Sequence, residues 1–300
     1  MSNLDVVAAL IRWMTFSATM LLVGIVVFRI VATRSVLDAG DAEAQAFAER
    51  AARSSRGIGS GVAVGLIAVS GMRLGVQVMT LAGGDPWRPL VTAVALHTSW
   101  GRGWMVGLVG AASMFAYMRV GKASLAAIGV VLLAVSPALT GHAIASPTHA
   151  VIAVIADATH VLGASAWLGT LLVIVVVGMP ASAVAPESRA RLIARTVTGF
   201  SPIALGGALA VGLSGALNGL LRVDHVALLW TTLYGGLLLA KVGLFVLIGA
   251  VGAYNWRRVT PRMTGGGGVD LLRRSALAEL TLAAVVLGVT AVFVGTDLPM

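Results

Sequence analysis

The chain has 300 residues, of which 58% are apolar and only 11% are charged, and its mean hydropathy is +0.95. Soluble domains carry about 25% charged residues, so this chain has too few polar groups to cover a globular surface in water. An ordinary soluble enzyme, a disordered tail and a collagen-like fibre are therefore excluded, and a polytopic helical membrane protein remains. The absence of cysteine excludes disulfides, thiolate nucleophiles, iron–sulfur clusters and thiolate metal sites.

Eight hydrophobic stretches follow one another along the chain, and each reaches the ~20 residues that a helix needs to cross the bilayer. We place them at residues 5–33, 57–84, 98–118, 123–142, 147–179, 198–217, 228–254 and 274–295. No basic residue precedes Leu10 and the first stretch is long, so we expect a retained span rather than a cleaved signal peptide. We therefore expect an all-α bundle, one integral membrane domain over residues 1–300, in which residues 38–53 could form a short surface helix.

Lys and Arg are distributed unevenly between the two sides of this bundle. The even-numbered loops and both tails hold two of them, Arg88 and Arg222, whereas the odd-numbered loops hold fourteen. These are Arg34, Arg50, Arg53, Arg56, Arg119, Lys122, Arg189, Arg191, Arg195, Arg257, Arg258, Arg262, Arg273 and Arg274. Because basic loops stay in the cytoplasm, we expect both termini in the periplasm of a bacterial inner membrane. The net charge of +9 is then an orientation signal, and attraction to anionic lipid comes second.

All five histidines map to the outer side or the outer half of the expected bundle: His97, His142, His149, His160 and His225. Imidazole is the commonest protein metal ligand and the usual axial ligand of haem. This clustering on the side where a periplasmic metal arrives favours a metal site. For His97 and His225, a solvated loop histidine is an equally good interpretation.

The region around His160 gives the sharpest hypothesis. Ser146-Pro147 predicts a helix that begins near Pro147. His149 and His160 are eleven residues apart, which returns to within about 20° of the same helical face. Asp157 can accept the spare imidazole N–H of His160 and so fix which ring nitrogen faces a metal. The alternative is a buried Asp–His hydrogen bond that only joins two helices.

Methionines and further buried charges complete the candidate set. Thioethers favour Cu(I), and Met79 and Met105 are the first candidates on grounds of depth, although any single methionine is also ordinary core filler. Arg73 lies inside span two at about the depth of Asp157, where a gating or coupling role competes with a structural one. Lys241 and Glu279 lie in consecutive antiparallel spans, and we expect a structural ion pair because a lone charge in lipid is costly.

Several stretches of spans three to eight, taken in order, resemble the bacterial copper resistance protein D (CopD) family. They are Thr98-Ser99-Trp100-Gly101-Arg102, Gly141-His142-Ala143, DATHVLGASAWLG at residues 157–169, Thr232-Leu233-Tyr234-Gly235 to Lys241, Asn255, and Leu272-Arg273-Arg274 with Glu279. Spans one and two match only in hydrophobic character, and the end Thr296-Asp297-Leu298-Pro299 departs from the family's Thr-Pro-Pro-like tail. The resemblance implies an eight-span inner-membrane protein that handles copper, often beside a periplasmic copper-binding partner. By position it implies copper contacts at His142 and His160, and less surely at His149.

Three functions remain open, and none of them needs a catalytic residue. The first is a copper permease that moves copper from periplasm to cytoplasm, with one ion, as Cu(I), held by His142 and His160 and completed by His149, Met79 or Met105. The chain shows no ATP-binding motif, so such transport would be passive or ion-coupled. The second is a b-type haem electron-transfer protein, in which two histidines clamp the iron. The third is a non-transporting membrane partner of a periplasmic copper chaperone. Lipid and copper are the expected partners and nucleic acid is not; a homo-oligomer is left open.

Overall fold

The computed structural model describes residues 3–37, 42–141, 149–180, 186–223, 225–259 and 268–296, and the regular structure in these ranges is helical. The long helices are α1 (Asn3–Leu37), α2 (Ala42–Ala82), α4 (Ser99–Val120), α5 (Ala123–Thr140), α8 (Pro186–Leu220), α10 (Leu233–Tyr254) and α11 (Gly268–Phe293). One further run joins α6 (Ala150–Ala164), the π-helical η2 (Ser165–Gly169), α7 (Thr170–Val173) and the π-helical η3 (Ile174–Gly178). The short helices are α3 (Leu90–His97) and α9 (Leu228–Thr231), and the π-helical η4 (Asn255–Val259) extends α10.

Eight helices in the described part are long and apolar enough to cross a membrane, which confirms the eight expected spans. The two largest extensions ahead of the hydrophobic pattern are at the beginnings of α2, at Ala42, and of α8, at Pro186. The segment expected as a separate surface helix is therefore continuous with α2 from Ala42 onward. Phe47 and Ala44 of α2 form a buried cluster with Leu192 of α8. The two extensions therefore stabilise one another.

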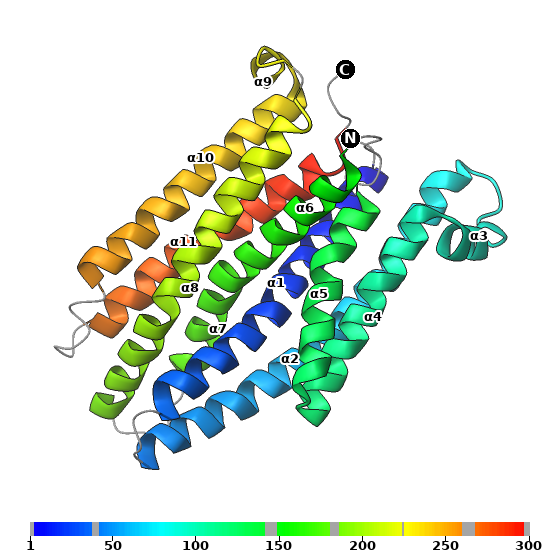
Figure 1. Ribbon diagram of the computed structural model, residues 1–300. Coiled ribbons are helices and arrows are strands. Elements are labelled where there is room, and N and C mark those ends of the chain that lie inside the picture. The colour runs from blue at the N-terminus through cyan, green and yellow to red at the C-terminus, as the bar shows by residue number, and fades with distance from the viewer. Residues whose placement is uncertain are drawn as a thin grey trace.

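Helix α1 lies at the centre of the bundle. It packs against α2 on one side and against α8, α11 and the η2–α7 segment on the other, as Figure 1 shows in dark blue. Leu22, Ile25 and Phe28 of α1 are fully buried in the main core. The beginning of α1 and the end of α11 lie at the same end of the bundle (Figure 1), and Trp13 Nε1 donates a hydrogen bond to the Ala284 carbonyl at 3.2 Å.

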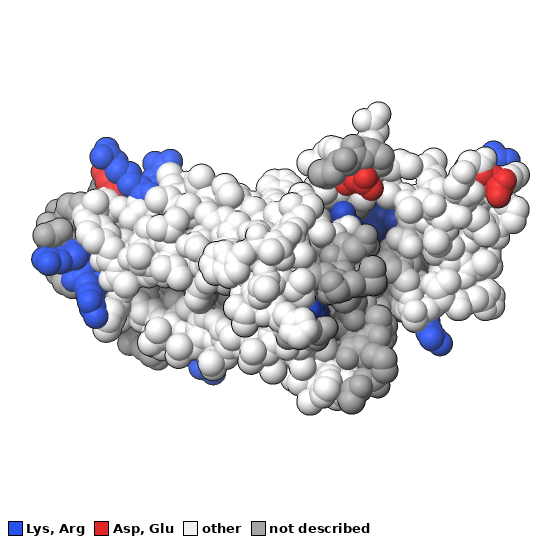
Figure 2. Space-filling view, turned by 90° about the horizontal axis from the view of Figure 1, so that it is seen from above, with Lys and Arg blue, Asp and Glu red and all other residues white. Residues whose placement is uncertain are grey.

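The outer surface of the helices is apolar and the charges gather at their ends. Helix α10 is the clearest case, because Val242, Val246 and Leu247 all project outward, as a lipid-facing helix requires. Figure 2 shows blue Lys and Arg atoms concentrated at the end where α10 and α11 meet, and a white surface over most of the body. Exposed side chains there include Arg257, Arg258, Arg273 and Arg274.

Two helix crossings bring backbone against backbone. A Cβ added to Gly24 of α1 would lie 2.3 Å from the carbonyl carbon of Gly169 in η2. A Cβ added to Gly207 of α8 would lie 2.7 Å from the Gly163 carbonyl oxygen of α6. Small residues permit such close approach in membranes, where van der Waals contact rather than water exclusion holds helices together. The second crossing fixes α6 against α8, and the candidate site lies on these two helices.

A structural motif occurs twice, in the two halves of the chain. Thr98 follows α3 and Thr232 follows α9, and each hydroxyl caps the next helix by accepting from the backbone N–H of Gly101 or Gly235, at 2.9 and 3.0 Å. Each hydroxyl also donates to a carbonyl four residues earlier. Neither glycine tolerates a Cβ, because the short helix's carbonyl would lie within 2.3 Å. When the two capping threonines are aligned, Gly107 of α4 corresponds to Lys241 of α10.

The α6–α8 crossing predicts a position-specific cost on α8. Gly207→Ala should lower the free energy of unfolding by about 1–3 kcal/mol, because the new methyl group overpacks the contact with Gly163. The adjacent Gly206→Ala is the matched control, since nothing lies within 4 Å of its Cβ position. Thermal unfolding in detergent measures both. Equal losses in the two variants would contradict the crossing.

Candidate functional site

His160 occupies a half-buried position within α6 and faces α8. Its Nδ1 lies 3.2 Å from the Ser214 hydroxyl oxygen. That hydroxyl donates its own hydrogen to the Ala210 carbonyl, so it is available to accept from Nδ1–H. This tautomer leaves Nε2 of His160 as the nitrogen with a lone pair for a metal.

Asp157 does not orient His160 as expected. Its carboxylate is paired with Arg222, Nη2 to Oδ2 at 3.0 Å, and both side chains are about one-fifth exposed. The imidazole faces Ser214 on α8, whereas the Asp157 carboxylate, three residues earlier, faces Arg222, which follows α8. Ser214 takes the partner role that the sequence assigned to Asp157.

Lys241 adds a second cation to this region. Its Nζ lies 4.6 Å from the centre of the Phe293 ring, a cation–π contact, and Phe293 also stacks with Tyr234 at 4.4 Å between ring centres. Lys241 interacts electrostatically with Asp157, Arg222 and His160. The region around His160, Lys241 and the Asp157–Arg222 pair therefore contains one carboxylate, two cations and one imidazole.

The expected Lys241–Glu279 ion pair does not form between these two described residues. Glu279 instead accepts a hydrogen bond from the Asn255 side-chain amide, and its side chain is 3% exposed. Lys241 reaches Phe293, which lies fourteen residues, or about 21 Å of helix rise, beyond Glu279 on α11. The order of the spans correctly indicates that Lys241 and Glu279 lie on neighbouring helices. The two side chains lie at different depths along those helices, so they do not meet.

The remaining candidate metal ligands do not meet at His160. His149 is the exposed N-cap residue of α6, about 16 Å of helix rise from His160, too far to share one ion. Met79 on α2 is 51% exposed. Met105 lies on α4, which packs against α2, α3 and α5, and Figure 1 places α5 and α6 between α4 and α8. Within the described ranges, no three His, Asp or Glu side chains are grouped to hold a metal.

His142 and the expected helix start at Ser146-Pro147 lie outside the described residues. The His142–His160 pair therefore stays a prediction from the sequence.

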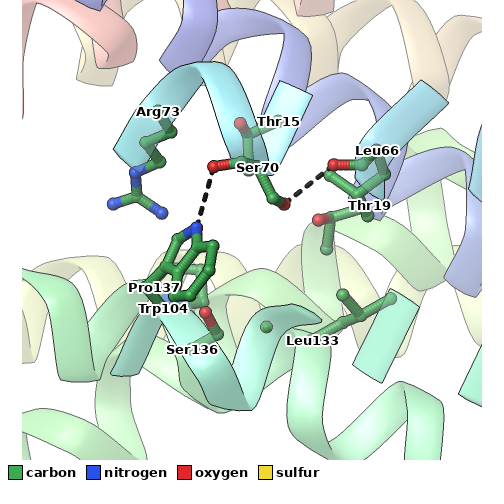
Figure 3. A pocket seen from close by; sticks show the side chains of 10 residues that line it. Thr15, Thr19, Leu66, Ser70, Arg73, Trp104, Leu133, Ser136 and Pro137 are labelled. Carbon is green, nitrogen blue, oxygen red and sulfur yellow. Dashed lines mark hydrogen bonds between the residues drawn. The ribbon is translucent and has the colours of Figure 1, made fainter. Parts of the chain in front are cut away.

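Arg73 lies in the other half of the bundle, at a small polar cavity (Figure 3). Its Nη2 donates to the Thr140 hydroxyl at 2.8 Å, and its guanidinium lies 5.5 Å from the centre of the Trp100 ring. The cavity volume is about 20 Å³, room for one water molecule. Its polar lining comes from Thr15, Thr19, Ser70, Arg73, Trp104 and Ser136. These contacts join α2 to α4 and α5.

Taken together, the fold is that of a multi-pass helical membrane protein with a polar, histidine-containing interface between α6 and α8. Comparison with known proteins defines it further. The family model for the copper resistance protein D-like N-terminal domain matches residues 2–150, and the model for copper resistance protein D matches residues 194–293. These matches follow one another along the chain and together cover most of it, so the chain belongs to the copper resistance protein D family.

One curated relative is similar over part of its length. The copper transport protein CutJ of Bacillus subtilis (strain 168) is 32% identical over 167 residues, which make up 56% of this chain and 29% of the relative. The chain thus spans less than a third of that protein. No solved structure matches the chain. His160 lies between the two family-model matches, so its proposed role depends on the local residues and on the geometry around Ser214.

The Asp157–Arg222 pair predicts a coupling that a double-mutant cycle measures. Asp157→Asn and Arg222→Gln should each destabilise the protein, and the double variant should be more stable than the sum of the two losses implies, with a coupling energy of about 0.5–3 kcal/mol. The exposed Glu43–Arg191 pair, at 3.6 Å, is the matched control and should couple by about 0–1 kcal/mol. Additive losses at Asp157 and Arg222 would show that the pair is not energetically coupled.

Proposed function

We propose that this protein is a copper permease of the bacterial inner membrane that moves copper from periplasm to cytoplasm. The observation that carries the proposal is the state of His160: a half-buried imidazole on a spanning helix, with Nδ1 turned to Ser214 and Nε2 available to a metal. An imidazole at membrane depth is costly and commonly marks an ion pathway. The name of the relative CutJ, a copper transport protein, supports the same cargo.

The charges around His160 suit an ion that passes through rather than one that stays. Two cations and one carboxylate interact with this part of the interface, so a copper cation at Nε2 is repelled more than it is attracted. A transport site must bind its ion well enough to admit it and weakly enough to release it. Asp157 compensates one of the two cations and so lowers the electrostatic barrier to the entry of a copper ion.

We further propose His142 as the second copper contact, on the residue-level resemblance, with the cargo as Cu(I). An imidazole pair is a reasonable ligand set for copper when no thiolate is present. The proposed uptake direction follows from the expected orientation, in which α6 begins on the periplasmic side and His160 lies deeper in the span. That orientation depends on the fourteen-to-two distribution of basic loop residues.

The orientation predicts the result of reporter fusions. Fusions at Gly40 and Gly266 should report a cytoplasmic location, because they follow the first and precede the last span in strongly basic loops. A fusion at Gly84, between α2 and α3, is the matched control and should report a periplasmic location. A periplasmic signal at Gly40 or Gly266 would reverse the proposed direction of uptake.

The copper proposal predicts a graded loss of Cu(I) affinity. His160→Ala should weaken binding strongly, and Ser214→Ala should weaken it by roughly 10–100-fold, because the ring loses the group that fixes its tautomer. His225→Ala is the matched control, since His225 is exposed, and should bind as the parent does. Competition with a Cu(I)-specific chelator measures these affinities.

Two measurements separate this function from its competitors. Copper uptake into proteoliposomes by the parent, lost in His142→Ala/His160→Ala, supports a permease over a non-transporting partner of a chaperone. Binding without uptake would favour that partner. If the purified parent shows a Soret band and the same double variant lacks it, the protein binds haem and the permease proposal is wrong.

A further inference from the structure

Glu279 is a carboxyl group buried near the middle of α11, and neither the ion-pair network nor the candidate copper site uses it. It is 3% exposed. Its hydrogen-bond partner is the Asn255 side-chain amide, at the point where α10 passes into η4. Within the described residues, no ion pair involves Glu279.

In the described part of the chain, the elements packed against α11 offer this carboxyl no cation. Helix α11 contacts α1, α10 and the π-helical and short segments η2, α7, η3 and η4. The run of residues 165–178 carries no ionisable side chain. The titratable groups of the other elements have separate locations. Arg12 lies beside Gly295, Arg29 over Tyr117, and Lys241 and Tyr234 against Phe293, while Asp5, Arg34, Tyr254, Arg257 and Arg258 are exposed. On α11 itself, Asp270, Arg273 and Arg274 are exposed.

A carboxylate without a cation is unfavourable in such a place, and the group avoids the cost by carrying a proton. Asn255 donates to one oxygen of Glu279, which stabilises either form of the carboxyl.

The backbone around Glu279 is irregular on two sides. The π-helical segment η4 begins at Asn255, and the π-helical segment η2 contains Trp167, whose ring lies 3.9 Å from the Cβ position of Gly252. The Glu279 carboxyl oxygens lie 3.8 and 3.9 Å from that same position. Single π-helical turns inside α-helices are concentrated at functional sites. In η2, the Ser165 hydroxyl is fully buried without a hydrogen-bond partner among the described residues.

We propose that Glu279 is a proton-binding site that takes up and releases a proton as the protein moves copper. In uptake, one proton from water joins a carboxylate oxygen of Glu279 and gives the neutral acid; in release the same O–H bond breaks and the proton returns to water, with no electron transferred. The inference rests on the proposed copper transport, to which it adds the coupling ion.

Infrared difference spectroscopy tests the proton site without any transport. In the parent, a step in bulk pH should change the C=O stretching band of a protonated carboxyl group. The band should be absent in Glu279→Gln and shifted, not lost, in Glu279→Asp. Glu49→Gln, the same change at an exposed glutamate on α2, is the matched control and should keep the band. A parent without such a band, or a band that Glu279→Gln leaves intact, overturns the proposal.

The hydrogen bond from Asn255 gives a second spectroscopic signature. Asn255→Leu removes the donor to the carboxyl oxygen, so the C=O band of Glu279 should move to higher frequency. An unshifted band would show that the Glu279 acid is not the group observed. Size-exclusion chromatography establishes that each variant remains folded.

Proteoliposomes with an entrapped pH indicator test the coupling. Addition of Cu(I) to vesicles with the parent should change the lumenal pH, and Glu279→Gln should abolish that change. Copper uptake with the same proton flux in Glu279→Gln overturns the coupling. A parent that moves no copper overturns the proposed permease instead, while the infrared bands still decide whether Glu279 binds a proton.

Discussion

The backbone contact between α1 and the run from α6 to η3 is the constraint on which the bundle depends. At Gly24 and Gly169 there is no room for even one methyl group, so α1 lies in the middle of the molecule rather than at its edge. In a bilayer, lipid tails are as apolar as leucine, and such close contacts hold helices together where water exclusion does not. With α1 central, α2, α4 and α5 lie on one side, and α8, α10 and α11 on the other.

The charges inside the spans are accommodated in four different ways. Asp157 has a true counter-ion in Arg222. Arg73 uses a hydroxyl and an indole ring, and Lys241 uses a phenyl ring. Glu279 has an amide. Each solution lowers the cost of a charge in lipid, but only the first cancels it. Among the described residues, Arg73, Lys241 and Glu279 form no ion pair, and in the proposed permease a buried group of this kind can respond to an ion that moves nearby.

The repeated threonine cap relates the two halves of the chain. Thr98 and Thr232 make the same pair of hydrogen bonds between a short helix and the long spanning helix that follows it. The repeat aligns Gly107, which lines the small cavity beside Arg73, with Lys241 in the histidine-containing half. The two halves thus share a framework but differ in what faces the interior. Neither the capped short helices nor the repeat was predicted, although Thr-x-aromatic-Gly occurs in both halves of the sequence.

The sequence by itself determined the eight spans, their approximate ends and the family, because hydrophobic length in a bilayer and the order of short motifs are local properties. It also pointed to His160, Asp157, Lys241 and Glu279 as ionisable residues within the spans. Only the tertiary structure decided their partners: Ser214 for His160, Arg222 for Asp157, Phe293 for Lys241 and Asn255 for Glu279. Periodicity gives the face of a helix, but the depth and rotation of its neighbour depend on where two backbones can approach, and that is set by contacts such as Gly163 with Gly207.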